Sequence, residues 1–257
     1  MRNRLAVAIT ALAAASVFCP RLSGQNNKNQ AQAQAQPSAA TPQGTPAATP
    51  TEITGLWDVT RSGYDFASFS KGDPPMTQWG KAQFDAAKPS QGPRGVTLSE
   101  TTDKVYKCSP PGMPYIYLQI FPMQIVQTPK EVIEIFEYDH NVRYIYTDGR
   151  KHPADLTPTY NGHSIGHWEG DTLVVDTIGL NGKNWLDRLG HPESEEMHIT
   201  ERIHRVDAKF LQVDFTFDDP KSYPKPWTAT LRYQARPTWD LMELICEDNL
   251  AFESFEK

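Results

Sequence analysis

Short segments in which apolar and polar residues alternate are the feature that most constrains the fold of this chain. In Lys209–Phe217 the residues Leu211, Val213, Phe215 and Phe217 fall on one side of an extended strand, with polar residues between them. A strand of this kind has one apolar face and one hydrated face. That pattern is typical of antiparallel sheets, because parallel sheets are usually covered on both faces.

The same alternation, bounded by turn residues, recurs along most of the chain. It predicts strands at Ile53–Thr60, Glu131–Tyr138, Asn141–Thr147, Ser164–Trp168, Thr172–Thr177, His198–Val206, Lys209–Phe217, Trp227–Ala235 and Leu241–Glu247. Helical spacing is found in Thr77–Lys88. Because tight turns such as Glu169-Gly170-Asp171 join consecutive strands, we expect a mainly β protein, an antiparallel up-and-down β-barrel with one short helix. A β-sandwich is the alternative.

The first 24 residues have the pattern of a secretory signal peptide. Arg2 and Arg4 precede an apolar run of 14 residues, Leu5–Phe18, which is followed by small and polar residues. The run is too short to span a membrane. Cys19 follows Phe18, whereas a lipobox has a small residue at that preceding position. We therefore expect cleavage near residue 24 and an exported protein, periplasmic or secreted, with lipid anchoring at Cys19 as the less favoured alternative.

Residues 25–52 are rich in Gln, Ala, Pro and Thr and contain no aromatic residue, so we expect a disordered linker there. The barrel domain is expected to occupy residues 53–257. Cys108 and Cys246 are the two cysteines outside the signal segment. In an oxidising compartment they are expected to form a disulfide, and two buried free thiols are the alternative.

Charge and composition exclude several classes of function. The chain has 25 Lys+Arg against 31 Asp+Glu, a net charge of −6, which argues against a nucleic-acid binder. No apolar stretch of about 20 residues occurs beyond the N-terminus, so no transmembrane segment is expected. Gly-rich phosphate-binding motifs are also missing from the sequence, and it identifies no organic cofactor. Nothing in the sequence indicates an oligomeric state.

Two stretches resemble known families. Gly55-Leu56-Trp57 resembles the GxW opening of lipocalin-like barrels. From Asp73 to Asn249 the chain resembles an uncharacterised family of exported bacterial proteins, through a GHSIGHWEGDTLVVDT-type block. The other segments that carry this resemblance are PPMTQWGKAQFD, KCSPPGMP, YIYTDGRKHP, WLDRLGHPESEEMHITERIHRVD and ELICEDN. It implies export and a single domain, and it implies no established activity.

Five of the seven histidines lie between residues 163 and 204, which indicates a site in this region. On a continuous strand His167 and Glu169 share a face about 6.6 Å apart, a spacing that lets both ligate one divalent metal ion. A third ligand would then come from elsewhere, such as His191 or His198. The alternative is that this segment is a polar hairpin tip.

The long loop Leu180–Met197 has no regular pattern, and loops of this length are often functional. Asp187 and His191 lie in it and are candidates for acid–base catalysis. Ser194 would complete a triad with them, but no GxSxG motif accompanies it.

The strand that follows this loop places a carboxylate among apolar residues. Glu201 shares a strand face with Ile199 and Ile203, so we expect it to point inward, with Arg143 as its counter-ion. The pair either fixes the register of the barrel, or Glu201 is a catalytic acid with a raised pKa.

Three functions fit these observations. The favoured one is an exported barrel that binds a small apolar or aromatic ligand in its lumen. The candidate ligand-binding residues are Trp57, Arg143, His163, Trp168 and Trp185. The second is a cofactor-independent or metal-assisted lyase, isomerase or hydrolase, whose catalytic candidates are His167, Asp187, His191 and Glu201. The third is a structural or interaction protein of the cell envelope.

Overall fold

The computed structural model describes residues 52–60 and 67–247, all of which fall within one structural unit, Pro46–Lys257. The expected signal peptide (1–24), Cys19 and the linker up to residue 51 lie outside the described residues. Residues 61–66 and 248–257 of the expected barrel domain lie outside them as well.

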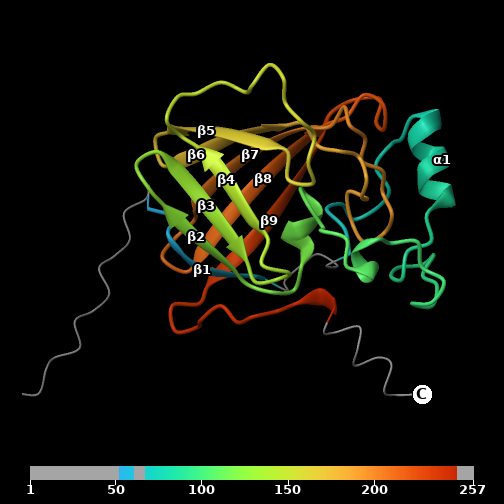
Figure 1. Cartoon of the computed structure of the whole chain (residues 1–257), viewed down its shortest axis with the longest axis horizontal. Helices are drawn as coiled ribbons and strands as arrows, with labels where there is room; N and C mark the ends of the chain where they lie inside the picture. The colour runs from blue at the N-terminus through green and yellow to red at the C-terminus, as the bar shows by residue number, and fades with distance from the viewer. Residues whose placement is uncertain (1–51, 61–66, 248–257) are drawn as a thin grey trace, which may run out of the picture. The chain divides into compact units, whose positions relative to one another are not determined.

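Nine strands form a closed β-barrel in which each strand pairs with the next along the chain and the last pairs with the first (Figure 1). They are β1 (Gly55–Val59), β2 (Met123–Gln127), β3 (Glu131–Phe136), β4 (Val142–Tyr146), β5 (His163–Glu169), β6 (Thr172–Ile178), β7 (His198–Arg205), β8 (Phe210–Asp218) and β9 (Trp227–Ala235). The expected mainly β barrel is confirmed.

One pair of strands departs from the expected up-and-down order. β4 and β5 run parallel, with Ile145 opposite Ser164 and Tyr146 opposite Ile165, whereas every other neighbouring pair is antiparallel. A parallel pair requires the chain to cross back to the end from which it came. Residues 147–162 make this connection, which is why no tight turn joins these two strands.

The expectation of a strand at Leu241–Glu247 is wrong, and β2 was not expected. Leu244 forms one isolated bridge with Tyr138, and two residues later Cys246 is bonded to Cys108. This segment is therefore held against the barrel by a covalent bond and not by a strand ladder. β2 takes its place in the barrel wall, between β1 and β3.

The expected helix is confirmed as α1 (Gln78–Ala86), which lies outside the barrel (Figure 1). It begins after Thr77, whose hydroxyl oxygen accepts a hydrogen bond from the Gly80 amide at 3.0 Å, as an N-cap does. Thr77 also donates its amide hydrogen to the Ser222 carbonyl at 2.9 Å. Gly80 allows a close approach there, because a Cβ would lie 2.3 Å from the Ser222 oxygen. Two short 3₁₀ helices, η1 (Val105–Lys107) and η2 (Tyr115–Leu118), follow α1 along the chain.

The inward faces of the strands form the hydrophobic core. The alternation predicted for β8 is confirmed, because Leu211, Val213, Phe215 and Phe217 are all buried. They pack in one cluster with buried residues of the other strands and of η2. Within residues 52–60 and 67–247, no helix combines the length and hydrophobicity that a membrane span requires.

Candidate functional site

Three of the sequence-predicted site residues lie in the core of the barrel. Trp57 is fully buried, and its indole nitrogen donates to the Ile53 carbonyl at 3.0 Å. Arg143 and Glu201 are also buried and form an ion pair, as expected from the inward position of Glu201. Arg143 Nη1 also contacts Glu134 Oε2 at 3.1 Å. Glu134 and Glu201 are thus both paired with Arg143 in the core, which favours the structural interpretation of Glu201.

The residues around the β5–β6 hairpin lie mainly on the outside. His167 Nε2 contacts Glu169 Oε1 at 3.2 Å, and Glu169 also pairs with Arg202 at 2.9 Å. His163 contacts His152 through the Nδ1 atoms at 2.8 Å, and Trp168 packs against the core.

The two residues considered as a third metal ligand lie elsewhere. His191 contacts Asp187 and Asp73, and His198 contacts Asp176. Among the described residues, no group of three His, Cys, Asp or Glu side chains is placed to hold a metal ion. The structure therefore brings no third ligand to His167 and Glu169.

Asp187 and His191, the acid–base candidates of the long loop, are brought together and buried. His191 Nδ1 lies 2.6 Å from Asp187 Oδ2, and Ser68 donates its hydroxyl hydrogen to the same oxygen at 2.6 Å. Asp187 Oδ1 accepts the amide hydrogen of Leu189 at 3.0 Å. Ser194 does not join them, because its hydroxyl and amide both bond to Asp219.

Both ring nitrogens of His191 are occupied. Nε2 lies 3.2 Å from Asp73 Oδ1, and the ring of Phe84 stacks on the imidazole at a centroid distance of 4.8 Å. Burial lowers the pKa of His191, but the hydrogen bonds and charges of Asp187 and Asp73 outweigh it and raise this pKa overall. The imidazole lies between two carboxylates and links the loop to the segment before α1, and both of its nitrogens already have partners.

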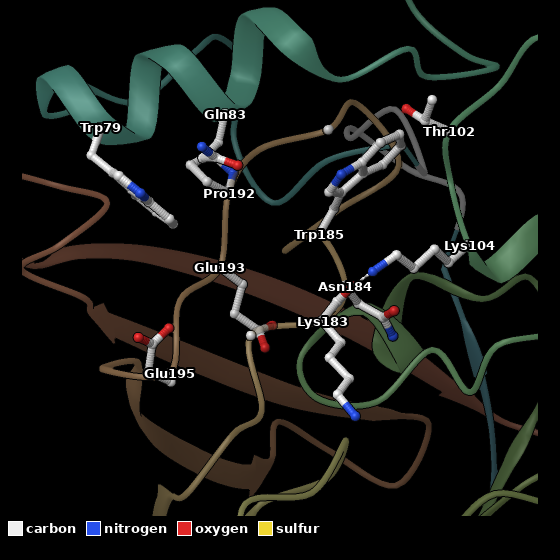
Figure 2. Close-up of a pocket in the computed structure, with 12 residues that line it drawn as sticks. Trp79, Gln83, Thr102, Lys104, Lys183, Asn184, Trp185, Pro192, Glu193 and Glu195 are labelled. Carbon is white, nitrogen blue, oxygen red and sulfur yellow. Dashed lines mark hydrogen bonds between the residues drawn. The ribbon is translucent and has the colours of Figure 1, made fainter.

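A pocket of about 200 Å³ lies between α1 and the same loop (Figure 2). α1 contributes Trp79 and Gln83, and the loop contributes most of the other residues. The full lining is Trp79, Gln83, Thr102, Lys104, Gly182, Lys183, Asn184, Trp185, Gly190, Pro192, Glu193 and Glu195. Gly190 has a φ of +85°, and a Cβ there would lie 2.7 Å from that of Ala87, so glycine is required where the loop passes the end of α1.

Glu193 is the unusual member of this lining. Its side chain is buried, and its Oε2 atom has no hydrogen-bond partner among the described residues. Burial, together with the nearby charge of Asp219, raises the pKa of the Glu193 carboxyl well above its ordinary value of 4.5. A buried carboxyl without a partner is costly to the fold, and such groups concentrate at functional sites.

Asn184, which also lines the pocket, has a second unpartnered polar atom. Its amide nitrogen donates both hydrogens, to the carbonyls of Pro110 and Pro111, the latter at 2.9 Å. These bonds fix which end of the amide is the oxygen. The buried Oδ1 atom accepts no hydrogen bond within the part of the chain that the structure describes. Two residues of the pocket lining, Glu193 and Asn184, therefore each carry a buried polar atom without a partner among the described residues.

The sequence indicated this loop, with Trp185 as a ligand-binding candidate and Asp187 as a catalytic one, and it did not indicate Glu193. Asp187 is fully hydrogen-bonded, whereas Glu193 is the buried acid in the pocket lining. No periodicity surrounds Glu193, so the sequence carries no signal for its burial. Asn184 was missed because its role depends on two carbonyls more than 70 positions away.

Replacing Glu193 by glutamine is expected to stabilise the protein increasingly as the pH rises. The folded protein keeps a proton on Glu193 that the unfolded chain releases above about pH 4.5, so this carboxyl's contribution to stability falls as the pH rises towards its folded pKa. Glutamine does not ionise, and the variant should gain at most about 1.4 kcal/mol over the wild type for each pH unit in this window. Urea unfolding from about pH 4 to about pH 7 measures the difference.

The matched control is Glu196→Gln, an exposed neighbour in the same loop. Its stability should follow that of the wild type across the same range. Parallel curves for Glu193→Gln and the wild type would show that Glu193 is already ionised in the folded protein.

Comparison with protein-family models and with curated proteins found no relative of this chain. No protein-family model matches the chain, and no curated protein matches it significantly. The four catalytic candidates do not share one site, since His167 is exposed, Glu201 is in the core, and only Asp187 and His191 are in contact. The pocket beside α1 combines the buried Glu193 with the indoles of Trp79 and Trp185.

Proposed function

We propose that the protein is exported and binds a small molecule in the pocket between α1 and the Leu180–Met197 loop. The observation that carries the proposal is the unpartnered, buried carboxyl of Glu193 in the wall of that pocket. A molecule bound there would contact the Glu193 side chain, which lines the pocket. Partly buried indoles of Trp79 and Trp185 offer apolar contact area beside it (Figure 2).

The site proposed here differs in place from the lumen considered in the sequence analysis. Inward residues of the strands, from Trp57 to Tyr233, pack against one another and against η2 in a single buried cluster. The barrel thus serves as a rigid support, and the binding residues lie on segments outside it. Placing a site on loops carried by a stable scaffold is a common arrangement.

Export is supported by two independent features. Cys108 and Cys246 form a disulfide that closes a sequence separation of 138 residues, and structural disulfides persist in oxidising compartments. The N-terminal pattern of Arg2, Arg4 and the apolar run has the order of a secretory signal. The resemblance to exported bacterial proteins agrees with both.

Native mass spectrometry of the protein, produced from the full chain and collected from the exported fraction, tests this proposal. We expect a bound organic mass that is lost on unfolding. Trp185→Ala should weaken binding of the identified molecule by about tenfold or more, because it removes a large contact surface from the pocket wall. Trp239→Ala is the matched control, since Trp239 is half-exposed and does not line the pocket.

Equal affinity in Trp185→Ala and the wild type would contradict the proposed site. Retention of the whole chain inside the cell, with the N-terminal segment uncleaved, would contradict export. Thermal denaturation of both tryptophan variants distinguishes lost contacts from lost folding.

A further inference from the structure

We propose that His152 and His163 form a pH-sensitive switch, which holds the crossover segment (residues 147–162) against the barrel near neutral pH and releases it in acid. This segment joins β4 to β5, which lie parallel and share two residue pairs. The proposal goes beyond the proposed function, because neither histidine lines the pocket beside α1. It follows from the attachment of the segment, from the geometry of the two rings and from the charges around them.

The crossover segment is hydrogen-bonded to the barrel near both of its ends. At the start the Thr147 amide donates to the Lys130 carbonyl at 2.8 Å, and near the end the Thr159 amide donates to the Gly179 carbonyl at 3.0 Å. Between these points, residues 148–158 are exposed except for His152 and Leu156.

One side-chain hydrogen bond attaches the middle of the segment. Within the described part of the chain, the bond between His152 and His163 is the one that joins residues 148–158 to a strand. His163 is the first residue of β5, so its backbone is held in the barrel. Loss of this bond would therefore free the exposed stretch, while the barrel itself stays closed.

The two imidazole rings point at each other through their Nδ1 atoms. These atoms lie 2.8 Å apart, and the ring planes are inclined by 69° at a centroid distance of 5.0 Å. A hydrogen bond between two such nitrogens needs one hydrogen, because one Nδ1 atom donates and the other accepts. Two protonated rings would bring two donors face to face. The contact therefore tolerates one imidazolium in the pair but not two.

Asp176 on β6 determines which of the two rings accepts. Its Oδ2 atom lies 3.6 Å from His152 Nε2, a buried nitrogen without a hydrogen-bond partner among the described residues. A carboxylate favours a hydrogen on the nitrogen that faces it, so His152 Nδ1 is left as the acceptor and His163 Nδ1 donates. His163 can take up one proton at Nε2 and still donate. A second proton enters at His152 Nδ1, and the bond breaks.

Positive charges around His163 oppose its protonation. Burial lowers the pKa of His163 below its ordinary value of 6.5, and the charges of His152 and Arg150 lower it further. Arg150 lies over the ring of Tyr146 on β4, and that ring packs against His163 at a centroid distance of 5.4 Å. Asp148, in the same turn, pairs with Arg150 at 2.6 Å.

Negative charge near the pair is limited to shared carboxylates. Asp176 also contacts His198 on β7, so one carboxylate faces three histidines. Glu131 on β3 acts on Arg150 and raises the pKa of that guanidinium.

The sign of the pH dependence follows from the lowered pKa of His163. The unfolded chain takes up the proton near pH 6.5, whereas the folded protein takes it up at a lower pH. The contribution of the contact to stability is therefore complete above about pH 6.5 and is lost as the pH falls to the folded pKa.

Limited proteolysis of the full exported protein measures the release. Endoproteinase Glu-C cleaves after Asp and Glu in both mild acid and neutral solution, and Asp155 in the crossover segment is exposed. A synthetic peptide of residues 147–162, cleaved under the same conditions, corrects for the effect of pH on the enzyme. We expect the protection of Asp155, the ratio of the peptide rate to the protein rate, to be at least about tenfold lower at about pH 4.5 than at about pH 7.5.

Variants of His163 separate the switch from a general effect of acid. His163→Asn keeps a donor that does not titrate, and its amide can turn to accept from a protonated His152, so its protection should change by less than about twofold. His163→Ala should be weakly protected at both pH values. His152→Ala, in the exposed segment, gives the same test if His163→Ala does not fold. His140→Asn is the matched control, because His140 is exposed and its φ of +47° suits asparagine.

Near-ultraviolet circular dichroism at each pH checks that the barrel remains folded. Equal protection of the wild type at the two pH values would overturn the proposal. So would an equal loss of protection in His163→Asn and the wild type, because the release would then not depend on the second imidazole. Loss of the near-ultraviolet signal before the protection falls would show that acid unfolds the whole barrel, which also contradicts a local switch.

Discussion

Replacing Arg143 by methionine is expected to lower the free energy of unfolding by about 3–5 kcal/mol, because it leaves two carboxylates in the barrel core without a counter-ion. Glu134 and Glu201 both contact the guanidinium, and all three side chains are almost completely buried. When one member of such a cluster is removed, the desolvation free energy of the remaining buried charges is no longer offset by an ion pair.

The surroundings of Arg143 show how completely its guanidinium is used. It donates to the hydroxyls of Tyr117 at 2.9 Å and Thr177 at 2.8 Å, and its Nε donates to Ser164 at 3.1 Å. Burial lowers the pKa of Arg143, but the opposing charges, that of Glu201 first, hold it well above its ordinary value. Arg143 is therefore charged in the folded protein, and β3, β4, β5, β6 and β7 meet at its side chain.

The loss in the free energy of unfolding caused by Arg143→Met should increase as the pH rises. Burial raises the pKa of Glu134 above 4.5 even with Arg143 present, and removal of the arginine should raise it further. The folded variant would then hold protons that its unfolded chain releases, so its stability should fall as the pH rises above about 4.5. Urea unfolding at about pH 4 and about pH 7 should show a smaller difference from the wild type at the lower pH.

Two comparisons separate the buried charges from a simple packing defect. The triple variant Arg143→Met, Glu134→Gln and Glu201→Gln should recover much of the lost stability, since no uncompensated charge remains. Arg202→Met, next to Glu201 on β7, removes an exposed pair with Glu169 and should cost at most about 1 kcal/mol. Equal losses in the single and the triple variants would show that the volume of Arg143 matters and its charge does not.

The barrel could be predicted from the sequence because strands carry a local signal. Alternation in Lys209–Phe217 reports which residues face inward, and the structure buries all four of the predicted ones. The inward position of Glu201 follows from the same rule. The parallel pairing of β4 with β5 could not be predicted in this way, because alternation does not specify the direction of a neighbour.

The pocket could be predicted only in part, for a physical reason. Its walls come from α1, the segment around Thr102 and the Leu180–Met197 loop, and no local pattern states that these three meet. The burial of Glu193 is a property of that meeting and not of its neighbours in sequence. Trp185 was a candidate because it is an aromatic residue in an irregular loop. His167 was a candidate because the histidines cluster in sequence, and it is exposed on the β5–β6 hairpin.

The disulfide connects the stability of the barrel to the proposed site. Cys108 is the C-cap of η1, and after Ser109 come Pro110 and Pro111, whose carbonyls accept the hydrogen bonds of Asn184. Cys246 lies in the segment that contacts Tyr138 through an isolated bridge at Leu244. The bond therefore joins the segment that hydrogen-bonds to Asn184, a residue of the pocket lining, to the segment around Cys246, in addition to closing a long loop.

Replacing both Cys108 and Cys246 by serine is expected to lower the free energy of unfolding by up to about 5 kcal/mol. The chain-entropy treatment gives this value for a cross-link that closes a separation of 138 residues, because the unfolded chain gains the conformations that the bond forbids. Cys246 is buried, so the bond should resist reduction until the segment opens. Urea unfolding of the wild type and the double variant measures the difference.

Dithiothreitol provides the control for the disulfide. It should bring the midpoint of the fully reduced wild type close to that of the double variant, and it should leave the double variant unchanged. Because the orientation of Asn184 depends on carbonyls next to Cys108, the folded double variant should also bind the ligand of the wild-type pocket more weakly. Lower stability with unchanged affinity would show that the bond acts on the unfolded chain alone, and equal midpoints would show that Cys108 and Cys246 are not joined in the exported protein.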